Sequence, residues 1–287
     1  MIEKGKEQWY NKLFRMLNSA VCFSLAYIVL TYADWFVMGL VGKLLFKFDV
    51  FVHYYGLRFI LAGQYWSKLK VTLVYGSGPM FFLIAGLVCL YIYDKLKEYP
   101  TQLNLFLYWC FVIGTSLFAS QAAIAALGAG EYNSPYYQGF SVVLAWWKAP
   151  NIVSYILVVP FALLLIYFAV NYTRPFLHFS FSYARVNKLS RRRRYFLETA
   201  MVPFVIGALI TTIVTFPLNI FVHAVYLFTI GIALIVSWLA MFYIEIPKDD
   251  VLKYKSLQQL NFTFVFFLAL AIGFVMLTWK GIYLSFD

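Results

Sequence analysis

The segment VYGSGPMFFLIAGLVCLYIY, residues 74–93, is apolar along most of its length, yet two glycines, a serine and a proline stand near its start. About 20 apolar residues are enough for a helix to cross a bilayer. The whole chain has this character, since 63% of its 287 residues are hydrophobic and 12% are charged, whereas globular proteins contain about 45–50% and about 25%. The composition therefore predicts an integral membrane protein. Because no polar linker separates the apolar segments, we expect one domain, 1–287.

Seven segments are long and apolar enough to be spans, namely 16–42, 73–93, 103–127, 150–171, 200–217, 219–244 and 260–279. Each is expected to be helical, because lipid offers no partners for open backbone groups. The fifth and sixth are joined tightly around Pro217 and are compatible with a helical hairpin. The predicted fold class is an all-α bundle of about seven transmembrane helices, with six as the alternative.

Basic residues predict the orientation of the bundle. Sixteen of the 23 Lys and Arg residues lie in the N-terminal segment and in every second loop, including the basic loop 172–199. The positive-inside rule places these segments in the cytoplasm, and we expect the plasma (inner) membrane of a bacterium. Within the loop, the run Arg191, Arg192, Arg193 and Arg194 predicts contact with anionic lipid head groups. Nucleic-acid binding is not predicted, because no aromatic-interleaved basic groove accompanies the run.

Two segments between the first two spans alternate in polarity. These are FKFDVFVHY at 46–54 and KLKVTLV at 68–74. A period of two is typical of a strand, so we expect a short strand-like hairpin at the membrane edge. An amphipathic segment lying in the interface is the alternative.

Polar residues at membrane depth suggest a site. Asp34 is the only acid well inside a span, where a charge costs roughly 2.5–3.5 kcal/mol near the bilayer centre. Ser77, Gln121, Asn219 and His223 are expected at matching depth in the outer half of the membrane. One hypothesis is an outward-facing polar pocket in which Asp34 and His223 form a proton-responsive pair. The alternative is interhelical hydrogen bonding that holds the bundle together.

The third span is rich in small residues between 114 and 130, many of them four apart, as are Ser116 and Ser120. Small residues at this spacing let helices approach closely. The pattern predicts either packing within the chain or a face for a homodimer or a membrane-protein partner.

The order of a first span, a strand-rich segment and a span that opens with GSGPMFFLIAGL (76–87) resembles the site-2 protease family of intramembrane zinc peptidases over residues 25–93. Gly lets a backbone pass close to a neighbour, and Pro79 would suit a first helical turn. That family's first span carries His-Glu-x-x-His for zinc, whereas LTYADWFVMGLVG (30–42) contains no histidine and only Asp34 as an acid. The family's Asp-Gly motif is missing from GAGEYNSPYYQG (128–139) as well. The resemblance therefore implies a degenerate relative without the zinc-binding motif, and no catalytic residue, metal or cofactor is predicted.

YGSGPMFFLIAG (75–86) also resembles the Gly-x-Ser-Gly span of rhomboid serine proteases, which would make Ser77 a nucleophile and His223 its base. Tyr75, however, stands where that family has its first glycine. Three functions stay open. The first is a non-enzymatic binding or assembly component. The second is a transporter or channel that uses the polar pocket. The third is an intramembrane enzyme of unrecognised type.

Overall fold

A computed structural model describes residues 2–53, 56–60, 63–96, 102–128, 134–180, 183, 186–215, 220–244, 260–278 and 281–284. The predicted all-α membrane fold is confirmed. The helices are α1 (Ile2–Phe46), α2 (Lys68–Leu96), α3 (Gln102–Leu127), α4 (Phe140–Trp146), α5 (Asn151–His178), α6 (Leu189–Phe196), the π-helical turn η3 (Leu197–Met201), α7 (Val202–Thr215), α8 (Ile220–Ala240) and α9 (Phe262–Leu277). A short 3₁₀ turn, η1 (Gly63–Tyr65), and the strands β1 (Val50–His53), β2 (Gly56–Phe59) and β3 (Ile282–Leu284) complete the fold.

Within the described residues, six helices are long and apolar enough to cross a membrane: α1, α2, α3, α5, the continuous helix Leu189–Thr215, and α8. The protein is thus a multi-pass membrane protein. The last apolar helix, α9, has 16 residues, which at 1.5 Å per residue gives a length of about 24 Å. That is shorter than the hydrocarbon core of about 30 Å.

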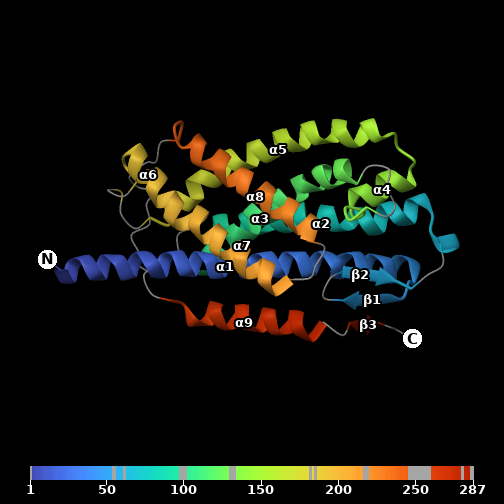
Figure 1. The fold of residues 1–287 in the computed structure, drawn as a ribbon, viewed down its shortest axis with the longest axis horizontal. Coiled ribbons are helices and arrows are strands. Elements are labelled where there is room, and N and C mark those ends of the chain that lie inside the picture. Colours follow the sequence, from blue (N-terminus) through green and yellow to red (C-terminus); the bar gives the residue numbers. More distant parts are fainter. Residues whose placement is uncertain are drawn as a thin grey trace.

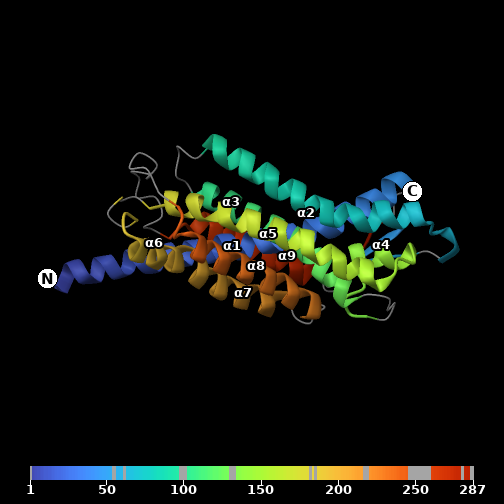
Figure 2. The same ribbon diagram turned by 90° about the horizontal axis from the view of Figure 1, so that it is seen from above.

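Helix α3 lies in the middle of the bundle, with α1, α2, α5 and α8 around it (Figures 1 and 2). Its small residues allow this position. A Cβ at Gly114 would lie 2.6 Å from the carbonyl oxygen of Phe82 and 3.0 Å from Cα of Gly86, so the backbones of α2 and α3 are in direct contact there. Ser116 and Ser120 are buried inside the chain as well. The described part of the small-residue face therefore packs within the chain.

The predicted hairpin between the first two spans is confirmed, but its second strand was misplaced. Strand β1 pairs antiparallel with β2, with Val50 opposite Phe59 and His53 opposite Gly56. Residues 68–74, predicted to be a strand, form the start of α2. The backbone N–H of Lys70 donates to Oγ of Ser67 at 3.3 Å, which is the N-cap arrangement that begins a helix. An alternating run of seven residues was too short to distinguish a strand from the start of a helix.

The early start of α2 also corrects the expectation for Pro79. It lies in the interior of the helix rather than in its first turn, where its missing N–H leaves the carbonyl of Tyr75 without its helical donor.

A third strand comes from the end of the chain. Strand β3 pairs antiparallel with the free side of β1, with Val52 opposite Ile282, so the strand order is β2-β1-β3. The sheet and α4 lie at one end of the bundle, and the start of α1 and α6 lie at the other (Figure 1).

Candidate intramembrane polar site

The carboxyl group of Asp34 lies against a glycine of the neighbouring helix. Asp34 is 7% exposed on α1. A Cβ built at Gly78 of α2 would overlap Oδ1 of Asp34 and would lie 3.1 Å from its Cγ and 3.2 Å from Cγ of Met38. A Cβ at Gly76, by contrast, would have nothing within 4 Å. Gly78 therefore leaves the space that the carboxyl group occupies.

The hydroxyl of Tyr226, on α8, accepts hydrogen bonds from two amide side chains. Nε2 of Gln121, on α3, donates to the Tyr226 hydroxyl at 3.0 Å, and Nε2 of Gln138, just before α4, donates to it at 3.2 Å. With both donors in place, the hydroxyl keeps its own proton to donate. Asp34 and Tyr27 lie near Tyr226.

Two buried acceptor atoms in this region receive no hydrogen bond from the described residues: Oδ1 of Asp34 and Oε1 of Gln121. Gln121 is 2% exposed. Its Oε1 lies where a Cβ of Gly139 would be, and Gly139 has a φ of +53° at the start of α4. Both the backbone angle and the Gln121 side chain therefore require glycine there.

His223 connects α8 to two other helices. Its Nδ1 lies 2.7 Å from the hydroxyl of Tyr27 on α1, and its Nε2 lies 3.0 Å from Oγ1 of Thr212 on α7. The Tyr27 and His223 rings meet edge to face, with their centroids 5.2 Å apart. Because residues three and seven apart share a helix face, His223 and Tyr226 face the same side of α8, as Tyr27 and Asp34 do on α1. We call these six residues the polar layer: Tyr27, Asp34, Gln121, Thr212, His223 and Tyr226.

Three of the five residues predicted for the pocket, Asp34, Gln121 and His223, thus belong to one layer. Ser77 is half-buried next to Gly78, and its Oγ donates to the carbonyl of Val74 in its own helix at 2.7 Å. Asn219 lies outside the described residues. The two tyrosines of the layer, Tyr27 and Tyr226, were not predicted from the sequence. The signal that could have found them is their spacing of seven residues from Asp34 and three from His223.

The residues around Asp34 do not fit the zinc ion that the site-2 protease resemblance would imply. A catalytic zinc needs three protein ligands, and no group of three His, Cys, Asp or Glu side chains occurs among the described residues. A serine-protease dyad is not assembled either. Ser77 donates to its own helix, and both ring nitrogens of His223 are engaged by Tyr27 and Thr212.

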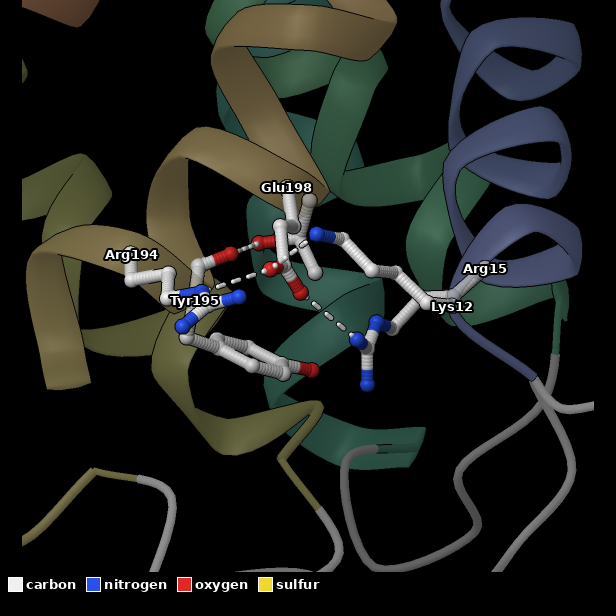
Figure 3. A network of polar contacts seen from close by, with 6 residues as sticks. Lys12, Arg15, Arg194, Tyr195 and Glu198 are labelled. Carbon is white, nitrogen blue, oxygen red and sulfur yellow. Dashed lines mark hydrogen bonds and ion pairs between the residues drawn. The ribbon is translucent and has the colours of Figure 1, made fainter. Parts of the chain in front are cut away.

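A second polar cluster lies at the basic end of the bundle (Figure 3). Glu198 accepts contacts from Lys12 at 2.8 Å, Arg15 at 2.9 Å and Arg194 at 3.3 Å. The guanidinium of Arg15 also lies over the ring of Tyr195, 4.9 Å from its centroid. This ion cluster ties α1 to the helix that contains α6, η3 and α7.

The turn that carries Glu198 is π-helical, and its backbone explains a further contact with α1. Pro203 has no N–H, so the carbonyl of Thr199 lacks its usual helical donor. Oγ of Ser19 on α1 donates to that carbonyl at 2.6 Å, and Nε1 of Trp109 on α3 donates to Ser19 at 3.0 Å. A chain of hydrogen bonds therefore joins α3, α1 and the π-helical turn.

The arginine run makes contacts within the chain. Arg192 donates to the backbone carbonyls of Val186 and Ile244. Arg193 lies over the rings of Trp238, at 4.4 Å, and Phe242, at 3.9 Å. Arg194 contacts Glu198, as described above. Arg191 and Arg194 are exposed, and the predicted contact of the run with anionic lipid head groups stays a prediction.

The fold defines a class, a multi-pass integral membrane protein with a polar layer inside its helical bundle. No family model, curated protein or solved structure matches the chain.

Proposed function

We propose that the protein is a non-enzymatic component of the membrane with a binding or assembly role, built on a protease-like arrangement without catalytic zinc ligands. One observation carries this proposal: both ring nitrogens of His223 are engaged, by Tyr27 of α1 and by Thr212 of α7. A histidine held in this way joins α8 to α1 and α7, which is the role expected of a polar residue that holds a membrane bundle together.

The hydrogen bonds of the polar layer support the same role. Gln121 and Gln138 bring α3 and the start of α4 to Tyr226 of α8. Such interhelical bonds hold the helices of a membrane bundle in register. The layer would then be a rigid frame, and binding would take place on the lipid-facing surface.

The proposed role is tested by cross-linking in cells. A photoreactive amino acid is placed at Leu40 on α1, which is 52% exposed and lines two grooves along that helix. Leu163 on α5, which is 62% exposed, is the control. We expect light to produce one adduct of defined mass from the Leu40 variant and not from the Leu163 variant. No adduct, or the same adducts from both positions, would contradict a binding role.

One observation favours a second candidate, a transporter linked to a proton or a cation. Oδ1 of Asp34 is buried and accepts no hydrogen bond from the described residues, and polar groups inside membranes often mark ion pathways. Proteoliposomes that contain a pH-sensitive dye separate the two functions. If the protein only binds, the wild type, Asp34→Asn and empty liposomes will give the same proton flux. A flux that the wild type supports and Asp34→Asn abolishes would favour transport.

A further inference from the structure

Two adjoining grooves run along the side of α1 that faces α9 and the sheet. One, of about 430 Å³, lies between α1 and α9 and includes Ile28 and Phe274. The other, of about 620 Å³, lies between α1 and the sheet and includes Lys47 and Val52. Both are lined by Phe36 and Leu40, and we call them together the α1 groove. From Ile28 to Lys47, α1 and its end cover about 29 Å at 1.5 Å per residue, close to the thickness of a hydrocarbon core.

The lining of the groove is apolar except at one end. Beside the sheet, its walls are formed mainly by side chains such as Leu44, Val50 and Leu57, and the polar groups among the lining residues belong to Lys43 and Lys47. Lys43 contacts Asp49 at 3.2 Å. Lys47 is exposed and forms no ion pair within the part of the chain that the structure describes. The groove therefore combines a hydrocarbon-lined length with a cationic mouth.

The backbone at this mouth is strained. Lys47 has a φ of +56° directly after α1, where its N–H donates to the carbonyl of Lys43 at 2.9 Å and the N–H of Phe48 donates to that of Gly42 at 3.2 Å. This helix end usually takes glycine, because a side chain at positive φ is unfavourable. Strained residues of this kind cluster at binding sites. A lysine here places a long cation at the groove although glycine would fit the backbone better.

We propose that the α1 groove binds an anionic lipid, with one acyl chain along Phe36 and Leu40 and the head group on Lys47. The inference rests on the proposed binding role and names its ligand class. A hydrocarbon chain matches the apolar walls, and basic residues at the membrane surface attract anionic head groups. Lys43, partly neutralised by Asp49, leaves Lys47 as the main partner of the head group.

Native mass spectrometry in detergent tests this assignment with two probes, phosphatidylglycerol and phosphatidylcholine with identical acyl chains. We expect the wild type to bind phosphatidylglycerol more tightly. Lys47→Asn removes the charge and suits a positive φ, so it should weaken phosphatidylglycerol binding about fivefold and leave phosphatidylcholine unchanged. Lys148→Asn is the matched control, since Lys148 also has a positive φ, +53°, and does not line the groove. Leu40→Trp fills the groove and should weaken binding of both lipids.

The outcomes separate this inference from the proposed function. Equal binding of both lipids to the wild type would mean annular lipid only and would overturn the inference. An equal effect of Lys47→Asn and Lys148→Asn would overturn it too. If the cross-linker at Leu40 captures a protein segment, the binding role stands and the lipid assignment falls. If it captures nothing, the binding role itself fails.

Discussion

Substituting Gly78 by alanine tests the contact between α2 and the Asp34 carboxyl group. The new Cβ would overlap Oδ1 and lie 3.1 Å from Cγ of Asp34. Rotating the carboxyl group moves only its oxygens, so the short distance to Cγ would remain. The new methyl would also lie 3.2 Å from Cγ of Met38. Relief thus requires Asp34 and Met38 to change their χ1 angles or α1 and α2 to move apart.

The expected change in the free energy of unfolding results from two opposing effects. Overpacking of a well-packed interior costs about 1–3 kcal/mol, and replacing glycine by alanine inside a helix stabilises it by about 1 kcal/mol. Gly76→Ala is the control, because a Cβ there has nothing within 4 Å and gains only the helix propensity. The free energy of unfolding of Gly78→Ala should therefore be about 1–3 kcal/mol lower than that of Gly76→Ala.

The assay is titration of the purified protein with sodium dodecyl sulfate in mixed micelles, followed by circular dichroism. Repeating both substitutions in an Asp34→Ala background completes a double-mutant cycle. There the difference between the two alanine variants should become smaller, because the carboxyl group has gone and only the contact with Met38 remains. Equal stabilities in the wild-type background, or an unchanged difference without Asp34, would refute the packing argument.

Three further predictions use the same unfolding assay. Glu198→Gln leaves Arg15, whose side chain is 6% exposed, without its ionic partner and should lower the free energy of unfolding by about 3–5 kcal/mol. Arg194→Gln changes a side chain that is 77% exposed and should lower it by about 1 kcal/mol or less. Equal losses would contradict the burial argument. Tyr27→Phe removes the hydroxyl that contacts His223 and should cost about 0.6 kcal/mol, and a stabilised variant would show that this contact contributes nothing. Gly114→Ala places a Cβ 2.6 Å from a backbone oxygen of α2, which no rotamer change can move. It should therefore cost about 3 kcal/mol and lower the yield of monodisperse protein. A wild-type yield and stability would contradict the close contact of α2 and α3.

The sequence predicted the helices well because length and apolarity decide a membrane span, and residue 34 stood out because acids are rare in such spans. The strands were harder to predict from the sequence. Residues 68–74 alternate as a strand does, but Ser67 caps a helix at that point. Strand β3 has three residues, too few for a pattern, and its pairing with β1 joins opposite ends of the chain. Local periodicity contains no information about such long-range pairing.

The polar layer was predictable only in part. Asp34, Gln121 and His223 were found because polar side chains at membrane depth are few. Tyr27 and Tyr226 were missed because they are two of 23 tyrosines in a chain with 21% aromatic residues, and composition cannot rank them. The role of Gly78 depends on which residue of α1 faces it, and only the packing of α1 on α2 determines that.

The strand order β2-β1-β3 has a consequence for how the protein is made. Ile282 pairs with Val52, so a ribosome synthesises and inserts every intervening helix before the outer edge of β1 receives its partner. Until then β1 presents open N–H and C=O groups to any extended peptide nearby. The sheet therefore stays incomplete until Ile282–Leu284 have been synthesised, and a purification tag fused after them needs a spacer that leaves these three residues free to dock.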